Sequence, residues 1–329
     1  MRPAPAGAKT VLHRPPKKPP DMPEEDRFPM KKLAAFLLAL LLLLTLTACA
    51  DNAGGSDSGG SRTDRADGRG TTADASDPSA EDEGTVLIDN EYCSVTVTEV
   101  LPDADSGYTL KVRLENKSTD RRYAFYASDG AVNRLEWDPF FYEEVSAGEK
   151  VIGEIVFSDA DLEQLIPAFT DIELHLRVAD AEDWSADPAA DETVHFYPLG
   201  EDGASVFVRQ TQSTDTVLED DEYCSAVVIG GPERDDPGLS VLLFLVNRTD
   251  EVIMISADDV FVNGIPCDPY WAKSIGPGNS CFSVMRWENE DLEENGITEV
   301  TEIRFTFRAY NDDDWDREDY FEKPVTLLP

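Results

Sequence analysis

A nine-residue stretch occurs twice in the chain, as Val-Leu-Ile-Asp-Asn-Glu-Tyr-Cys-Ser at residues 86–94 and as Val-Leu-Glu-Asp-Asp-Glu-Tyr-Cys-Ser at residues 217–225, 131 residues later. The offset of 131 or 130 then holds along both stretches, for Asn116 with Asn247, Asp138-Pro139 with Asp268-Pro269, Gly148 with Gly278, Asp161-Leu162-Glu163 with Asp291-Leu292-Glu293, and Trp184 with Trp315. A constant offset of this kind indicates an internal repeat. The sequence therefore predicts two copies of one domain, at residues 86–200 and 201–329.

Each copy has the pattern of β-strands. Polar and apolar residues alternate in 108–114, 172–178 and 303–308, as a half-buried antiparallel strand requires. Residues 239–246 are apolar nearly throughout, which predicts either a central strand covered on both faces or a contact between domains. Turn signals such as Asn263-Gly264 separate the runs. Only 159–165 and 288–295 suggest a helical turn. We therefore expect an all-β fold of two tandem immunoglobulin-like β-sandwich domains.

The N-terminal segment has the features of a bacterial export signal. Lys31 and Lys32 precede an apolar run that begins at Leu33 and ends at Leu46-Thr47-Ala48-Cys49. The run is shorter than the roughly 20 residues of a membrane-spanning helix, so a signal peptide is favoured over a permanent anchor. Its ending resembles the lipobox of bacterial lipoproteins, which implies cleavage between Ala48 and Cys49 and a diacylglycerol on the Cys49 thiol. Residues 1–48 are then leader and signal peptide, with 1–29 an upstream mis-start before Met30.

Residues 49–85 connect this signal to the first repeat. After Cys49 they are mainly Gly, Ser, Asp, Ala and Thr, with no aromatic residue and no aliphatic residue larger than Ala until residue 86. Such a segment cannot bury enough apolar surface to offset its ordering entropy, so we expect a disordered acidic linker. Its end-to-end distance is on the order of 30 Å for a flexible chain. The sequence thus predicts a tether between the membrane and the repeats.

The chain is strongly acidic, with a formal net charge of −39. This charge repels nucleic acid and anionic lipid, so we expect no nucleic-acid partner and membrane attachment only through the N-terminal lipid. Cationic partners and metal ions remain compatible with it, although an acidic surface also keeps a secreted protein soluble.

The second copy contains a series of short steps that has a counterpart among known proteins. These steps are Asn247-Arg248-Thr249-Asp250, Val262-Asn263, Asp268-Pro269-Tyr270, Pro277-Gly278, Asp291-Leu292-Glu293 and Asp313-Asp314-Trp315. Together with the lipobox, they resemble the uncharacterised tandem Ig-like lipoproteins of gut Firmicutes. The resemblance covers residues 86–329, and the first copy departs from it at Ala147-Gly148 and in 181–192. It implies an immunoglobulin-like fold on the outer face of a Gram-positive membrane, and it implies no activity.

Four cysteines remain after Cys49, which permits three disulfide connectivities. Cys267 and Cys281 take the places of Trp137 and Val151 on two successive strands, so either a disulfide or, in a reducing anaerobic environment, two thiols can form there. Cys93 and Cys224 occupy equivalent positions in the two copies. Equivalent core positions of two sandwiches are too far apart for a disulfide, so we expect buried free thiols at this pair.

Catalytic motifs are missing from the sequence. His13 lies in the leader, and His175 and His195 are replaced by Thr306 and Thr326 in the second copy. The nucleophile, zinc-protease, phosphate-loop and dinucleotide motifs do not occur. We therefore expect no enzyme activity and no cofactor.

An acidic run at 311–319 is a weak candidate for a metal site. Asp312, Asp314 and Asp316 stand at alternate positions, but the run lacks the glycine that an EF-hand loop needs, which favours a solvated loop. The sequence thus favours no metal site here. Trp184 and Trp315 are expected to anchor this loop in the core of each copy. Exposed aromatic residues can instead stack on sugars or proteins, so this end of the sandwich is the first place to look for a ligand.

These observations predict a lipid-anchored, extracytoplasmic and non-enzymatic binding or structural module for an unknown cell-envelope or extracellular ligand. Two alternatives stay open. One is a lipoprotein that captures a solute or polysaccharide for a transporter, although such proteins normally have a larger α/β architecture. The other is an accessory or inhibitor protein of a hydrolase.

Overall fold

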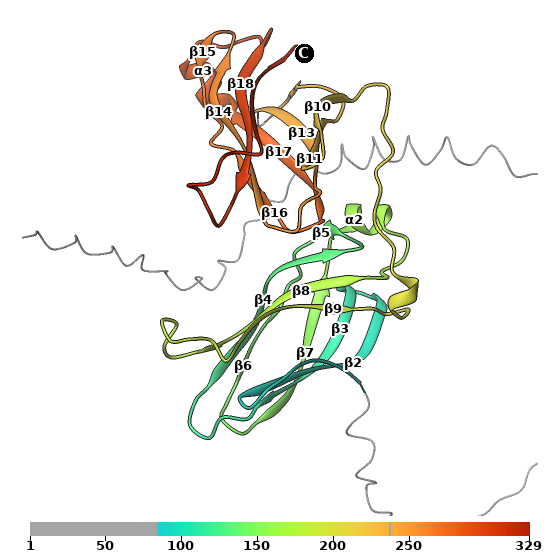
Figure 1. Ribbon diagram of the computed structural model, residues 1–329. Helices are drawn as coiled ribbons and strands as arrows, with labels where there is room; N and C mark the ends of the chain where they lie inside the picture. Colours follow the sequence, from blue (N-terminus) through green and yellow to red (C-terminus); the bar gives the residue numbers. More distant parts are fainter. Residues whose placement is uncertain (1–83, 237) are drawn as a thin grey trace, which may run out of the picture. The chain divides into compact units, whose positions relative to one another are not determined.

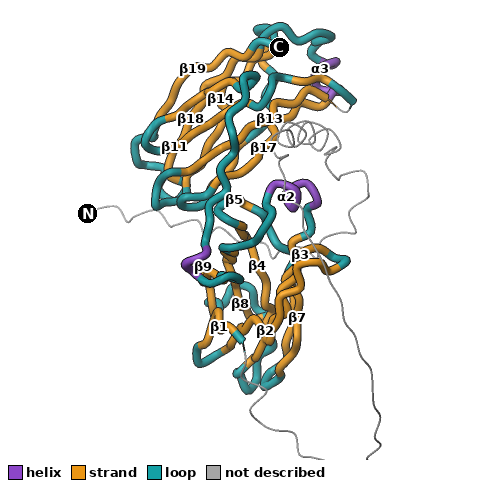
Figure 2. Tube along the Cα trace, turned by 90° about the vertical axis from the view of Figure 1, so that its right-hand side faces the viewer, coloured by secondary structure: helices purple, strands orange, loops and turns teal. Residues whose placement is uncertain are grey.

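The structure is a computed structural model that describes residues 84–236 and 238–329 (Figures 1 and 2). Residues 85–329 form one compact unit. The predicted signal peptide, the Ala48–Cys49 cleavage site, the lipidation site at Cys49 and nearly all of the linker lie outside the described residues. Within the described part of the chain, no helix is both long and apolar enough to cross a membrane.

The first repeat consists of two antiparallel sheets packed over a shared core. One sheet has the order β1-β2-β3-β7, formed by β1 (Thr85–Asp89), β2 (Cys93–Ala104), β3 (Gly107–Asn116) and β7 (Lys150–Phe157). The other has the order β5-β4-β8-β9, formed by β5 (Leu135–Glu136), β4 (Tyr123–Val132), β8 (Ile172–Asp180) and β9 (Ala190–Phe196), and β6 (Tyr142–Val145) also pairs with β4. The short helix α2 (Ala160–Leu165) follows β7.

The second repeat has the same strand order. Its first sheet is β10-β11-β13-β17, formed by β10 (Thr216–Asp220), β11 (Cys224–Val228), β13 (Gly238–Asn247) and β17 (Ser280–Glu288). Its second sheet is β15-β14-β18-β19, formed by β15 (Ile265–Pro266), β14 (Ile253–Val262), β18 (Ile303–Asn311) and β19 (Phe321–Leu327), with β16 (Ala272–Ile275) paired to β14. The short strand β12 (Glu233–Arg234) has no counterpart, and α3 (Asn289–Glu294) matches α2. The all-β sandwich and both helical turns are confirmed.

The two repeats are connected by a hydrogen-bonded segment and by a strand contact. The last strand of the first repeat ends at Phe196, and the second repeat begins at Thr216, so the predicted boundary at 200/201 falls inside the segment between them. This segment includes the 3₁₀ turn η2 (Glu201–Gly203). Ser280 of β17 pairs with Leu135 of β5, which joins sheets of the two repeats into one ten-stranded sheet.

Alternation of apolar residues places the core as the sequence predicts. In β3, Leu110, Val112 and Leu114 are all fully buried. The apolar stretch of β13 has two buried faces, because Leu243 belongs to the core of the second repeat while Phe244 belongs to the cluster that contains the core of the first. Both alternatives left open for residues 239–246 therefore hold at once: the strand is central, and its outer face is an apolar contact between the repeats.

The Asn-x-Ser/Thr step is a structural element of each repeat. Asn116 is fully buried, and its Nδ2 donates to the backbone oxygens of Arg121 (2.8 Å) and Val145 (2.9 Å). Asn247 is 1% exposed, and its Nδ2 donates to the backbone oxygens of Glu251 and Ile275. Each side chain thus satisfies backbone acceptors where β3 or β13 ends, which explains why the step occurs in both copies.

Candidate functional site

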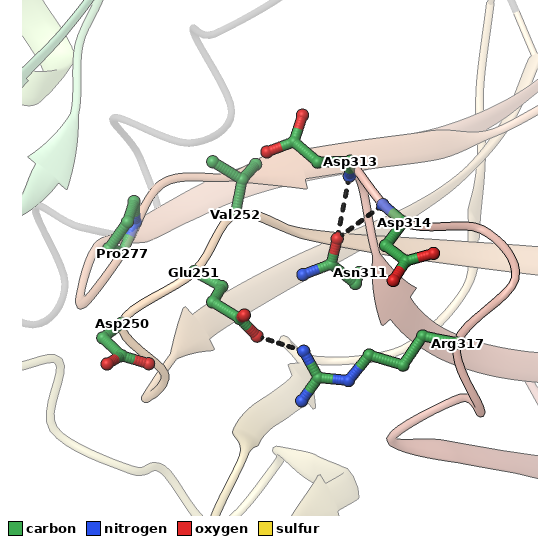
Figure 3. A pocket seen from close by; sticks show the side chains of 8 residues that line it. All are labelled: Asp250, Glu251, Val252, Pro277, Asn311, Asp313, Asp314 and Arg317. Atoms are coloured by element: carbon green, nitrogen blue, oxygen red, sulfur yellow. Dashed lines mark hydrogen bonds and ion pairs between the residues drawn. The ribbon is translucent and has the colours of Figure 1, made fainter.

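An open pocket of about 430 Å³ lies at one end of the second repeat (Figure 3). It forms where the loop between β13 and β14 meets the turn between β16 and β17 and the chain that leaves β18. Its lining residues are Asp250, Glu251, Val252, Pro277, Asn311, Asp313, Asp314 and Arg317. The acidic run of 311–319 therefore forms one wall of the pocket, and the loop at 250–252, which directly follows Asn247-Arg248-Thr249 and was not predicted as part of a site, forms another.

Asn311 fixes the shape of this wall. It is 6% exposed and lies opposite Ile253 in the β14–β18 ladder. Its Oδ1 accepts hydrogen bonds from the backbone N–H groups of Asp313 (2.9 Å) and Asp314 (2.7 Å). This is the turn that Asn and Asp side chains favour, and it directs the chain away from the sheet immediately after β18.

The pocket carries an excess of negative charge. Glu251 accepts hydrogen bonds from the Tyr320 hydroxyl (2.8 Å) and from Arg317 Nη1 (2.5 Å), and these two bonds lower the pKa of its carboxyl group. The carboxylates of Asp250 and Asp313 have neither a hydrogen bond nor an ion pair within the described part of the chain, and in Figure 3 no dashed line joins either one to the other residues that line the pocket. One guanidinium therefore faces four carboxylates around the pocket.

Trp315 follows directly after the pocket wall and is 73% exposed. Its Nε1 donates to the backbone oxygen of Asp312 at 2.6 Å, and its ring meets Tyr310 edge-on with centroids 5.9 Å apart. Arg308 lies over the other ring of this pair, 5.1 Å from the Tyr310 centroid. The expectation that Trp315 anchors its loop in the core is wrong, because the indole is held in place at the surface.

Trp184, the equivalent residue in the first repeat, is half-buried and lies 5.8 Å from the Tyr126 ring. Tyr126 stands opposite Arg177 in its ladder, and the matching position opposite Arg308 is Ser256. Because serine offers no ring for packing, the second repeat lacks the contact that partly covers Trp184.

The structure separates the three weak candidates for a metal site. Asp312 accepts a hydrogen bond from Ser274 Oγ at 2.5 Å, Asp314 lines the pocket, and Asp316 is exposed. Across residues 84–236 and 238–329, no group of three or more His, Cys, Asp and Glu residues is arranged to hold a metal ion. The acidic run is thus a surface loop in which Asp312 is bonded to Ser274 while Asp314 and Asp316 are exposed.

Both histidines lie on strands, as predicted. His175 on β8 pairs through Nε2 with Asp191 at 2.7 Å. His195 on β9 pairs through Nδ1 with Asp171 at 2.7 Å and lies 3.4 Å from Glu173 through Nε2. The partner of His175 thus lies on β9, and the partners of His195 are Glu173 on β8 and Asp171, which directly precedes β8.

All four cysteines that the structure describes are buried and free. Burial raises the thiol pKa of Cys93 to about 11 and that of Cys224 to about 12. Burial also raises the thiol pKa of Cys267 and of Cys281. The structure thus has thiols at Cys267 and Cys281, where the sequence also permitted a disulfide.

No protein-family model matches the chain, and no curated protein matches it. Among solved structures, it is similar to the YadV chaperone, with 14% identity, 71% of this chain and 99% of that chain covered, and a TM-score of 0.23. It is also similar to a chain in the complex of the Salmonella enterica SafA pilin with the SafB chaperone, with 10% identity, 75% and 100% covered, and a TM-score of 0.19. At these values neither likeness bears on what the chain does.

Proposed function

We propose that the protein is a lipid-anchored extracytoplasmic module, built from two immunoglobulin-like domains, that binds a cationic ligand at the end of its second repeat where the β16–β17 turn lies, and that it catalyses no reaction. The observation that carries this proposal is the exposed and fixed Trp315 next to an acidic pocket. The lipobox ending at Cys49 and the linker of 49–85 support the anchoring, because they provide the lipid acceptor and the tether.

The chemistry of this surface suits an ammonium or guanidinium group. An exposed tryptophan face attracts cations through its ring quadrupole, a contribution of about 0.5–1 kcal/mol at exposed sites. Asp250 and Asp313 can each accept charge-assisted hydrogen bonds from the same ligand. Exposed ion pairs contribute about 0.2–1 kcal/mol each. Together these contributions amount to about 1–3 kcal/mol, so the dissociation constant of one site for one cationic group is above about 1 mM.

Weak single contacts suit a protein held at a membrane. Many copies on one surface can engage a ligand with repeated positive charges, and multivalency raises the overall affinity by about 10² to 10⁴ without new contacts. We therefore expect the natural ligand to be a basic polypeptide segment that carries several Lys or Arg side chains.

The affinity of the site tests this proposal. A lysine-rich peptide is titrated calorimetrically into residues 50–329, which lack the signal peptide and the lipidated cysteine. Trp315→Ala is expected to weaken binding about two- to fivefold, as a contribution of about 0.5–1 kcal/mol implies, and the triple variant Asp250→Asn, Asp313→Asn, Asp314→Asn is expected to weaken it about threefold or more.

The matched control removes the same amount of charge elsewhere. Glu290, Glu293 and Glu294 are exposed carboxylates on α3, which precedes the start of β18, whereas the pocket lies at the end of β18. The triple Glu→Gln variant of α3 should bind within twofold of the unmodified protein. If it weakens binding as much as the pocket variant does, the attraction is one of net charge only, and the proposed site is wrong.

The anchoring is tested separately, in cells. A thiol is the only acceptor for the thioether-linked lipid, so Cys49→Ala should move the protein from the detergent phase to the aqueous phase. If the variant keeps both its membrane fractionation and its lipid-dependent mobility, the protein is not a lipoprotein.

A further inference from the structure

The turn between β4 and β5 of the first repeat contacts the turn between β16 and β17 of the second. The backbone oxygen of Arg134 accepts hydrogen bonds from Ser280 N (2.8 Å) and Ser280 Oγ (3.1 Å). The carboxylate of Glu136 accepts one from Gly276 N at 3.0 Å and pairs with Lys273 Nζ at 2.7 Å. Asn133 and Arg134 both have positive φ, 51° and 66°, which makes the turn tight enough for this approach.

A second carboxylate strengthens the same contact. Glu173 on β8 pairs with Arg134 Nη1 at 3.0 Å and accepts a hydrogen bond from Asn279 Nδ2 at 2.9 Å. Asn279 is 2% exposed. Glu173 therefore holds a cation of its own repeat and a buried amide of the other repeat at once, in a place sheltered from water where charge-assisted hydrogen bonds are strong.

Three phenylalanines add an apolar layer. Phe207, in the segment between the repeats, lies 6.1 Å from Phe244 and 6.3 Å from Phe282 between ring centroids, and Phe244 and Phe282 lie 5.0 Å apart. Phe207 N donates to the backbone oxygen of Asn133 at 2.7 Å. The connecting segment is thus fixed to the first repeat by its backbone and to the second by its side chain.

The repeat provides an internal control for these contacts. The contact residues of the second repeat are Lys273, Asn279, Phe244 and Phe282, and the first repeat has Glu143, Glu149, Arg113 and Ile152 at the equivalent positions. The contact residues of the first repeat include Arg134 and Glu136, and the second repeat has Gly264 and Pro266 at the equivalent positions. None of the polar partners is duplicated. The contact residues are therefore specific to the junction between the two repeats. A third repeat could not pack against either of them through the same contacts.

We infer that these contacts form a latch that holds the two repeats together as one rigid arm. Domains in one chain move relative to each other by default unless their interface is substantial and apolar. Here the three phenylalanines, the carboxylates of Glu136 and Glu173, and the pairing of β17 with β5 all lie at one junction. The arm carries the pocket of the second repeat at a fixed distance and direction from Thr85, where the linker ends and β1 begins. This inference does not depend on which ligand the protein binds.

Residual dipolar couplings of the strand amides test the latch in residues 50–329. The couplings of both repeats should fit a single alignment tensor, with the same magnitude for each repeat. In the latch variant Glu136→Gln, Glu173→Gln, Phe207→Ala, the two repeats should need tensors that differ in magnitude, while the dispersion of their amide signals shows that both remain folded.

A matched variant, Glu143→Gln with Glu149→Gln, removes two carboxylates from the equivalent turn of the first repeat, where no latch exists. It should keep the single tensor. Two tensors of different magnitude in the unmodified protein would overturn the inference, and so would a single shared tensor in the latch variant.

Discussion

Tyr126 and Ser256 occupy the same place in the two repeats, each opposite an arginine in its ladder, Arg177 for Tyr126 and Arg308 for Ser256. The Tyr126 ring lies 5.8 Å from Trp184, which is half-buried, whereas Trp315 meets the Tyr310 ring at 5.9 Å and is 73% exposed. The two copies thus place their equivalent indoles against different rings.

Replacing Tyr126 by serine should therefore expose Trp184. The variant is expected to show a red-shifted emission and faster acrylamide quenching of the Trp184 contribution, obtained as the difference from a Trp184→Phe background. Tyr92→Ser, at an exposed tyrosine of the same repeat, serves as the control and should leave both unchanged. An unchanged Trp184 signal in Tyr126→Ser would mean that the Tyr126 ring does not cover this indole.

The buried asparagines at the ends of β3 and β13 should contribute strongly to stability. Asn116→Ala and Asn247→Ala each leave buried backbone oxygens without a donor, at a cost of about 1–3 kcal/mol in the free energy of unfolding. Urea denaturation measures this loss as a lower midpoint. Asn295→Ala removes an exposed asparagine and is expected to change the free energy by less than about 0.5 kcal/mol. Equal effects at all three positions would show that the buried hydrogen bonds add nothing.

The buried thiols predict a loss of stability at alkaline pH. Burial raises the thiol pKa of Cys93 to about 11 and that of Cys224 to about 12, from an ordinary value of 9.0. Above pH 9 the unfolded chain therefore releases protons that the folded chain keeps. The free energy of unfolding should be fully present below pH 9 and fall as the pH rises toward 11. Cys93→Ala with Cys224→Ala should reduce this slope in urea melts between pH 8 and 10.5, and an unchanged slope would contradict the assignment.

Much of the fold is predictable from the sequence because its signals are local. The nine-residue repeat and the alternation in 108–114 identify duplicated β-strands, and the short helices occur where the sequence places them. The joining of β17 to β5 is not predictable in this way. It depends on Ser280 meeting Leu135 across 145 positions of the chain, and no periodicity encodes such a pair.

The candidate site was predictable only in part. Asp313, Asp314 and Trp315 are visible in the sequence as an acidic run with an aromatic residue. Asp250 and Glu251 are not, because they reach the pocket through the β14–β18 ladder, in which Ile253 lies opposite Asn311. The exposure of Trp315 is not visible in the sequence, because it depends on how the loop after β18 lies against the sheet, where the indole meets the edge of Tyr310.

The indole N–H signals give the most direct test of the proposed binding end. The chain has five tryptophans, and Trp315 is identified by its loss in Trp315→Phe. During titration of residues 50–329 with a lysine-rich peptide, we expect the Trp315 signal to shift and saturate together with the amides of 250–252 and 311–317, while the other four indoles stay in place. Shifts that gather on α3, that spread evenly over acidic surfaces, or that never reach Trp315 would contradict the account.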